Sequence, residues 1–225
     1  MKKYIILIII FVVSIILSIV IENYLDSNIL TDELKFKKEY ESINNKEWEI
    51  DGYKGIYISI SIPKNNLIKY ATNDNIVTLL QEGTHVIYFG NAYCNWCRSA
   101  VSVLIDAAKE YNLDEIYYYD FFALRDAFEE GNDNELVKLY EDIILELDSF
   151  IENTFDENSK AAGKKRLSAP TVVIVSSGKV VDAHYKTVDS HIDYNSDLND
   201  IQKEELKNIY QDMFSKLVFA CSDNC

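Results

Sequence analysis

The chain has 225 residues, which is enough for one or two domains with a sizeable core. Hydrophobic residues make up 48% and charged residues 26%, a composition that excludes overall disorder. The formal net charge of -15 disfavours nucleic acids and anionic membrane surfaces as partners, because both carry negative charge.

The N-terminal segment is much more apolar than the rest of the chain. From residue 5 to residue 21 the polar residues are two serines, and this run is about as long as the shortest helix that spans a membrane. A cleaved signal peptide is the alternative, but its apolar region is usually shorter and ends in a small-residue cleavage site, which "IENYLDSN" lacks. We therefore expect residues 1–26 to form a membrane anchor that crosses the membrane through residues 4–21.

Charge around this segment predicts its orientation. Lys2 and Lys3 precede the apolar run and acidic residues follow it. Since positive residues favour the cytoplasmic side, the body of this single-pass cell-membrane protein is expected to be extracytoplasmic. Disulfides form and persist in that compartment.

The body begins with a charged stretch, residues 27–53, that we expect to be a tether. It is expected to be helical in part, with Thr31 or Asp32 as the cap. Residues 56–62, "IYISISI", carry a bulky apolar residue at every second position, which predicts a strand that ends at Pro63.

A short helix and a buried strand are predicted next. Residues 72–83 favour a helix with Thr72 or Asp74 as its N-cap and Gly83 just past its end. Residues 85–90, "HVIYFG", are apolar, β-branched and aromatic, which is typical of a buried central strand.

Two amphipathic helices and another strand are predicted after Cys94. A helix follows Cys94 directly, and "EIYYYDFF", residues 115–122, predicts the third strand. Asn132 and Glu135 match a capping box for the second of these helices. The predicted buried faces consist of Val101, Leu104, Ile105 and Ala108 in the first helix, and of Leu136, Tyr140, Ile143, Ile144, Leu147 and Ile151 in the second.

The last part of the body predicts a hairpin and a helix. Residues 171–185 favour two strands joined by a turn at Ser177 and Gly178. A polar loop over residues 187–200 leads to the last helix, whose apolar side consists of Leu206, Ile209, Tyr210, Met213, Phe214 and Leu217. The order of these elements predicts an α/β sandwich around a mixed sheet.

The motif Cys94-Asn95-Trp96-Cys97 lies at the predicted N-terminus of a helix. The first thiolate would there face unpaired backbone N–H groups and the positive end of the helix dipole, which lowers its pKa. Cys97, one turn later, can reach the first sulfur and release a mixed disulfide. Cys94 is therefore the candidate nucleophile and Cys97 the candidate resolving thiol.

Other interpretations of the cysteines stay open. The same spacing supplies half of many zinc sites, two buried cysteines can fill a core, and a structural disulfide needs no turnover. Cys221 and Cys225 could form a disulfide that fixes the C-terminus, a shuttle that exchanges with Cys94 and Cys97, or the other half of a four-cysteine zinc site.

Around these motifs the chain resembles the thioredoxin superfamily, over about residues 54–218. The resemblance rests on "VIYFGNAYCNWCRSAVSVL", "APTVVIVSSGKVV" and the "TVDS" that follows. More narrowly, these segments are similar to those of membrane-anchored extracytoplasmic thioredoxin-like proteins of low-GC Gram-positive bacteria, a group that includes the bacteriocin transport accessory type. The resemblance implies a three-layer α/β/α sandwich with a mixed sheet and a helical insertion, and thiol–disulfide exchange without an organic cofactor.

The resemblance also implies a place where substrate binds. In this family a cis-proline faces the cysteine pair and its neighbouring backbone holds the substrate peptide, which assigns that place to Pro170 with Ala169 and Thr171. Tyr93 and Trp96 are expected to form a hydrophobic collar through which a partner cysteine docks, with ordinary packing as the alternative.

Four positions depart from the family's pattern. Asn95-Trp96 replaces the Gly-Pro of thioredoxin, and Tyr93 replaces the tryptophan before the first cysteine. Tyr88 lies where thioredoxin has a buried acid that helps to move the proton of the resolving thiol. The resemblance therefore implies exchange but not its direction.

Basic residues near the motif have two interpretations. Lys164, Lys165 and Arg166 precede Pro170, and Arg98 follows the motif directly. They could stabilise the Cys94 thiolate or attract an acidic partner, and the alternative is an ordinary solvated surface.

These observations together predict the organisation and function of the chain. The expected parts are an anchor at 1–26, a tether at 27–53, a thioredoxin-like domain at 54–220 with its helical insertion at about 126–168, and a cysteine tail at 221–225. The expected function is an extracytoplasmic thiol–disulfide oxidoreductase that acts on exported proteins and exchanges with an unidentified redox partner. The alternatives are a redox-silent accessory that binds a peptide along the cis-proline groove, and a four-cysteine zinc protein.

Overall fold

The computed structural model of the chain describes residues 14–17, 30–50, 52–131 and 134–217. The predicted membrane span at residues 4–21 lies largely outside these ranges, and the cysteine tail at 221–225 lies wholly outside them. Among the residues that are described, no helix has the length and apolar character needed to cross a membrane.

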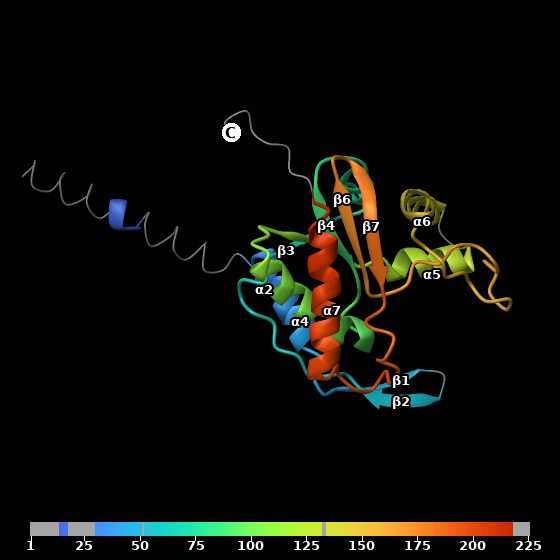
Figure 1. Cartoon of the computed structure of the whole chain (residues 1–225), viewed down its shortest axis with the longest axis horizontal. Coiled ribbons are helices and arrows are strands. Elements are labelled where there is room, and N and C mark those ends of the chain that lie inside the picture. Colours follow the sequence, from blue (N-terminus) through green and yellow to red (C-terminus); the bar gives the residue numbers. More distant parts are fainter. Residues whose placement is uncertain (1–13, 18–29, 51, 132–133, 218–225) are drawn as a thin grey trace, which may run out of the picture.

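A mixed sheet forms the centre of the body (Figure 1). Its strand order is β3-β5-β4-β6-β7, with bounds Ile68–Tyr70, Ile116–Tyr119, His85–Phe89, Thr171–Ser176 and Lys179–Tyr185 respectively. β3 and β4 pair in parallel with β5, whereas β6 is antiparallel to β4 and β7 is antiparallel to β6. The predicted mixed sheet is therefore confirmed.

Helices cover both faces of this sheet. One face carries α2 (Asp32–Glu41), α4 (Asn95–Glu110) and α7 (Asp200–Phe214), and the other carries α3 (Ile76–Gln81), α5 (Phe122–Glu130) and α6 (Asn134–Leu147) (Figure 1). Residues of β4 alternate between the two layers, because Val86 and Tyr88 pack in one apolar cluster and Ile87 and Phe89 in the other. This three-layer arrangement of thioredoxin-like topology buries the central strand on both faces, as its apolar sequence predicts.

The hairpin that follows Pro170 has the predicted turn. Ser177 and Gly178 both have positive φ, 52° and 74°, which is the backbone of a two-residue hairpin turn that matches the strand twist. Any Cβ on Gly178 would lie 2.6 Å from the Gln81 carbonyl oxygen, so only glycine fits against α3. The turn thus sets the register of β6, the strand that Pro170 precedes.

The stretch expected as a tether belongs in part to the folded body. Thr31 caps α2 by accepting a hydrogen bond from the Leu34 N–H at 3.3 Å, which confirms the predicted cap. Phe36 and Tyr40 on this helix are fully buried in the same cluster as Tyr88. Residues 32–41 are therefore part of the core rather than a free linker.

The prediction of a strand over residues 56–62 is wrong beyond Ile56. Ile56 ends β2 (Tyr53–Ile56), which pairs with β1 (Glu47–Ile50) in a separate antiparallel hairpin. From residue 57 to residue 63 the chain has no strand partner. The alternating pattern predicts an extended backbone, and whether a neighbouring strand lies beside it depends on the tertiary fold.

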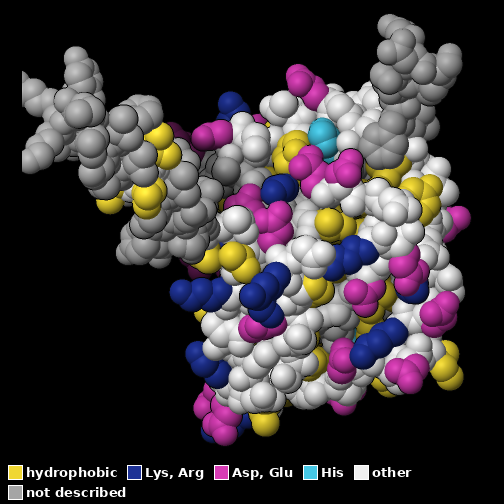
Figure 2. All heavy atoms as spheres, turned by 90° about the vertical axis from the view of Figure 1, so that its left-hand side faces the viewer, with side chains coloured by type: hydrophobic (Ala, Val, Ile, Leu, Met, Phe, Trp, Pro, Cys, Tyr) yellow, Lys and Arg dark blue, Asp and Glu magenta, His cyan; other side chains and the backbone are white. Residues whose placement is uncertain are grey.

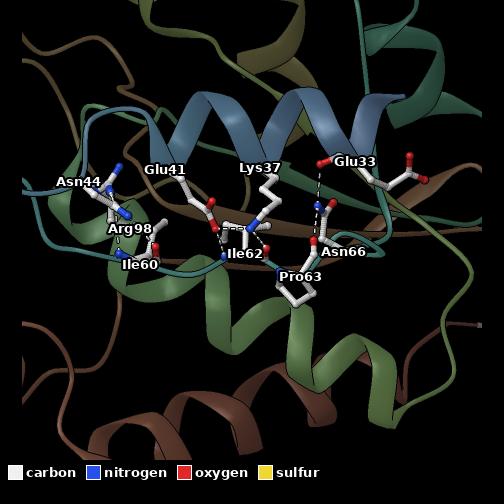
Figure 3. A network of polar contacts seen from close by, with 9 residues as sticks. All are labelled: Glu33, Lys37, Glu41, Asn44, Ile60, Ile62, Pro63, Asn66 and Arg98. Atoms are coloured by element: carbon white, nitrogen blue, oxygen red, sulfur yellow. Dashed lines mark hydrogen bonds and ion pairs between the residues drawn. The ribbon is translucent and has the colours of Figure 1, made fainter. Parts of the chain in front are cut away.

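Tyr57 still bonds to the backbone of Asn45 and Lys46, but beyond it side chains and not a strand bond to the extended backbone (Figure 3). The Asn44 amide donates to the Ile60 carbonyl at 2.8 Å and accepts from the Ile60 N–H at 3.1 Å. One turn away, Glu41 accepts from the Ile62 N–H at 2.7 Å, and Lys37 donates to the Ile62 carbonyl at 2.6 Å. The end of α2 thus replaces the hydrogen bonds that a neighbouring strand would supply.

Smaller differences concern helix ends. A strand is expected over residues 115–122, but the observed strand ends at Tyr119. Phe122 instead begins α5, a helix that the sequence did not predict. Asp120 explains this break, because its carboxylate accepts from the Phe122 N–H at 3.0 Å. The N-cap of α3 is Asn75 rather than Thr72 or Asp74. Asn132 of the predicted capping box lies outside the described residues.

The surface carries charges of both signs. On the face shown in Figure 2, basic side chains are interspersed with acidic ones, and hydrophobic side chains are scattered among them. The net charge of -15 is therefore not gathered into one acidic patch on this face.

Candidate active site

The Cys94 motif lies at the turn between β4 and α4. Asn91 shapes this turn, because its side-chain oxygen accepts from the Tyr93 N–H at 2.7 Å and its carbonyl accepts from the Cys94 N–H at 3.2 Å. Cys94 is the N-cap of α4, and its sulfur accepts from the Cys97 N–H at 3.3 Å. The predicted position of the first sulfur at a helix N-terminus is therefore confirmed.

Asn95 explains one departure from the thioredoxin dipeptide. Its side chain is fully buried, accepts from the Ile58 N–H at 3.0 Å and donates to the Ile56 carbonyl at 3.1 Å. Its own N–H, the first of α4, donates to the Tyr194 hydroxyl at 3.1 Å. Asn95 thus joins the motif to the extended segment at 57–63 and to the loop before α7, contacts that the sequence did not indicate.

Arg98 is fully buried, although the sequence left its environment open. Its guanidinium donates to the carbonyls of Ile58, Tyr40 and Ala92 at 2.7, 2.8 and 3.1 Å, and also to the Asn44 side-chain oxygen (Figure 3). Burial lowers the pKa of Arg98. The guanidinium donates to three backbone carbonyl oxygens and one side-chain oxygen, all within the protein. Arg98 therefore holds α4 against the N-terminal segments rather than attracting a partner at the surface.

The two cysteines have different environments. Both are free thiols, and Cys94 is 8% exposed while Cys97 is 0% exposed. Hydrogen bonds from the Cys97 side chain and from the N–H groups of Cys97 and Trp96 hold the pKa of Cys94 below its usual value, against the effect of burial. Burial raises the pKa of Cys97 well above its usual value, and Cys94 raises it further. A thiolate is therefore favoured at the accessible sulfur and disfavoured at the buried one.

Pro170 lies beside this pair. The Ala169-Pro170 peptide bond is cis, and the Cys94 thiol lies 3.8 Å from the Ala169 carbonyl oxygen in a weak hydrogen bond. The Pro170 carbonyl accepts from the Lys186 N–H at 2.8 Å, and the Thr171 hydroxyl donates to the Ser168 carbonyl at 2.7 Å. The structure thus brings together Cys94, Ala169 and Pro170, which come from distant parts of the sequence.

The two aromatic residues of the expected collar differ in exposure. Tyr93 is 58% exposed beside Cys94 and contacts the Tyr57 ring edge-on, with 5.8 Å between centroids. Trp96 is half-buried and packs edge-on against His191 and Tyr194, with centroids 4.7 and 5.5 Å away. Tyr93 is available to a docking partner, whereas Trp96 mainly packs under the loop before α7.

The basic residues at 164–166 interact with the helical insertion. Lys164 lies over the Phe128 ring, Arg166 lies over the Phe155 ring, and Lys165 donates to the Ile151 carbonyl at 2.5 Å. Each of these three side chains therefore has a partner within or beside the insertion, and none of these contacts involves Cys94.

The zinc alternative depends on residues that the structure does not describe. Cys221 and Cys225 lie outside the described ranges. Within those ranges, no group of three or more His, Cys, Asp or Glu side chains could hold a metal ion.

Comparisons with known proteins find a loosely similar solved structure. No family model and no curated protein matches the chain. The structure is similar to the crystal structure of thioredoxin from Aeropyrum pernix, with 16% sequence identity and a TM-score of 0.32, over 63% of this chain and 86% of that one. So loose a match adds no argument about function. The thioredoxin-like fold rests instead on the strand order and on a CxxC helix that faces a cis-proline.

Proposed function

We propose that the chain is a thiol–disulfide oxidoreductase that acts through Cys94 and Cys97. The observation that supports this most is the difference between the two sulfurs. Cys94 is partly accessible and its thiolate is stabilised by helix N–H groups, whereas Cys97 is fully buried one turn behind it. A thiol of the first kind attacks, and a thiol of the second kind resolves the product of that attack.

The exchange takes place in two steps. The Cys94 thiolate attacks one sulfur of a partner disulfide, the bond between the two partner sulfurs breaks, and the departing partner sulfur leaves as a thiolate. Cys97 then loses its proton and attacks the Cys94 sulfur, which releases the second partner sulfur as a thiolate. The partner gains two electrons and the Cys94–Cys97 pair becomes a disulfide. The same steps in reverse oxidise a partner dithiol.

The surroundings of Cys94 fit an extended polypeptide as the substrate. Tyr93, the residue before Cys94, offers an exposed ring, and the Ala169 carbonyl lies 3.8 Å from the Cys94 sulfur. Thr171 and Pro170 lie next to that carbonyl at the start of β6. In this proposal, Ala169, Pro170 and Thr171 hold the substrate backbone while its cysteine reaches Cys94.

The location and partners are part of the same proposal and rest on the sequence. The apolar run at 4–21, preceded by Lys2 and Lys3, supports a single-pass membrane anchor with the body on the extracytoplasmic side. The substrates would then be exported proteins, and a further redox protein would restore the pair. The narrower assignment to the bacteriocin transport accessory type is part of this proposal.

A trapping experiment tests the function. In the full chain, Cys97→Ser leaves the mixed disulfide on Cys94 without a resolving thiol, so we expect covalent partners on a non-reducing gel that disappear with reductant. The control is the double variant Cys94→Ser with Cys97→Ser, which should trap none. Equal bands in both variants, or none in either, would overturn the proposal. A redox-silent peptide binder would instead keep the same non-covalent partners in the unchanged protein and in both variants.

A further inference from the structure

The resolving thiol lies among buried tyrosine hydroxyls. Tyr88 on β4 is fully buried, and its hydroxyl donates to the Cys97 carbonyl oxygen at 3.3 Å. The hydroxyl of Tyr40 on α2, also fully buried, lies 3.3 Å from the Tyr88 hydroxyl in a hydrogen bond. The strand β4 and the helix α2 that packs on it thus bring two hydrogen-bonded hydroxyls to the first turn of α4.

A third buried hydroxyl, in the apolar cluster that also contains Cys97, has no partner among the described residues. Tyr210 on α7 is fully buried, and among the described residues its hydroxyl makes no hydrogen bond. It packs in the same apolar cluster as Cys97, and charge on Cys97 adds to the effect of burial in raising the pKa of Tyr210. A buried hydroxyl without a partner lowers stability, so its presence calls for an explanation.

The hydroxyls around Cys97 are hydrogen-bond donors and are not bonded to carboxylates in the described part of the chain. Within the described part of the chain, no Asp or Glu side chain hydrogen-bonds to Cys97, Tyr88, Tyr40 or Tyr210. Burial raises the pKa of all three tyrosines well above the usual value, so their hydroxyls stay protonated. They can donate hydrogen bonds to an anion but cannot take the proton of Cys97 as a base.

We propose that, when Cys97 ionises to resolve the mixed disulfide, the Tyr88 hydroxyl exchanges its bond to the Cys97 carbonyl for one to the Cys97 thiolate, that the Tyr210 hydroxyl donates to the same thiolate, and that Tyr40 orients Tyr88. This inference rests on the proposed function and names residues that make its second step possible. The Cys97 proton goes to water or to the departing partner thiolate, the Cys97 sulfur bonds to the Cys94 sulfur, and the bond from Cys94 to the partner breaks. Hydrogen bonds to an anion are stronger than those between neutral groups, so two donors would favour ionisation of Cys97 although neither takes up its proton.

An aromatic disulfide, 5,5′-dithiobis(2-nitrobenzoate), tests the two steps separately. All proteins are the full chain in detergent with Cys221→Ser and Cys225→Ser, so that Cys94 and Cys97 are the thiols present. The first thionitrobenzoate is released when Cys94 attacks the reagent, and the second when Cys97 attacks the mixed disulfide. The rate of each release is measured from pH 5 to pH 10, a range of about five units around thiol ionisation.

We expect Tyr88→Phe to slow the second release about tenfold at neutral pH and to move its midpoint up by about one pH unit, while the first release changes little. We expect Tyr210→Phe to slow the second release as well, yet to raise the melting temperature, because it removes an unpaired buried hydroxyl. Greater stability together with slower resolution is not the result of a purely structural defect.

Tyr118→Phe is the matched control. Tyr118 is fully buried beside Tyr88, but its hydroxyl donates to Glu39 at 3.1 Å. The second release should therefore stay within about twofold of the parent protein, a change well under one pH unit in midpoint.

An unchanged second release in Tyr88→Phe, or an equal slowing in Tyr118→Phe, would overturn the inference. An unchanged release in Tyr210→Phe would overturn the part assigned to that hydroxyl. If the parent protein itself released no second equivalent, the proposed function would fail instead, so the two failures can be told apart.

Discussion

At the scale of single residues, the chemistry depends on how much of each thiol is ionised, and the two sulfurs of the motif differ in what surrounds them. Both lie in one apolar cluster, but the sulfur of Cys94 accepts from the Cys97 N–H at 3.3 Å and Cys94 is 8% exposed, whereas Cys97 is fully buried. Local sequence predicts the first feature, since a cysteine before an amphipathic helix becomes an N-cap. The second depends on packing against α2 and α7.

The first prediction concerns the pH dependence of Cys94. Alkylation of the reduced full chain with iodoacetamide should occur at Cys94, with a midpoint below the value of about 8.5 for a free thiol. Only the thiolate reacts, so the rate should fall as the pH falls through this lowered pKa. Mass spectrometry of the labelled peptide measures the rate at each pH.

Cys97 is the internal control for that measurement. Because it is fully buried and its pKa is raised, it should stay unlabelled at neutral pH. Equal labelling of both cysteines, or a Cys94 midpoint at or above that of a free thiol, would contradict the account.

Not every residue of the site could be predicted. Cys94, Cys97 and Pro170 could be proposed from local motifs and the resemblance that they support. Asn95 and Tyr194 could not, because the hydrogen bond between them joins the motif to a loop that approaches it only in the folded chain. Tyr88 was noted as a departure, but its partners among the hydroxyls come from other elements.

At the scale of elements, the segment at 57–63 shows why a strand pattern can mislead. Alternation correctly predicts that this backbone is extended, but its hydrogen bonds go to Asn44, Glu41, Asn95 and Arg98. These side chains belong to α4 and to the segment around α2, and no local rule places them beside residues 57–63. α2 was predicted as a helix, and its burial was missed because its sequence is highly charged.

The second prediction tests Arg98 as the residue that joins these elements. Arg98→Met should lower the free energy of unfolding by about 2–4 kcal/mol, because three buried carbonyls lose a donor, partly offset by removal of a buried charge. Arg98→Lys should cost a similar amount, since a single ammonium cannot reach the carbonyls that the guanidinium fork serves. Chemical denaturation of the reduced protein measures both.

Lys54→Met is the control for that series. Lys54 lies on β2 with its side chain 72% exposed, in an ion pair with Glu49, and its replacement should change stability by no more than about 0.5 kcal/mol. A cost for Arg98→Met as small as that of Lys54→Met would show that Arg98 does not hold the segments together.

At the scale of the whole molecule, the layered fold follows from the order of its elements. From β3 to β5 strands alternate with helices, and later the terminal hairpin completes the sheet while α7 packs on one face of it (Figure 1). The range of the predicted insertion, about 126–168, contains the end of α5, all of α6 and irregular chain after α6, and α5 is not predicted because Phe121 and Phe122 continue an aromatic strand pattern. The anchor and the cysteine tail remain predictions from the sequence.

The overall arrangement also separates the two ends of the sheet. The turn of the terminal hairpin packs against the end of α3, whereas the cis-proline and the CxxC motif lie at the opposite ends of β6 and β4. The CxxC motif and the cis-proline thus lie at the same end of the sheet, where the end of β4 pairs with the start of β6.

The most direct test of the central claim is a redox titration of the full chain. The protein is equilibrated in glutathione buffers of stepped potential and alkylated, and its four cysteines are mapped by mass spectrometry. The account predicts that Cys94 and Cys97 become oxidised together in a single two-electron transition, with a tenfold change in ratio for about 30 mV. If both stay reduced across the whole range, or if only one of them changes, Cys94 and Cys97 do not form a redox pair and the proposed oxidoreductase is contradicted.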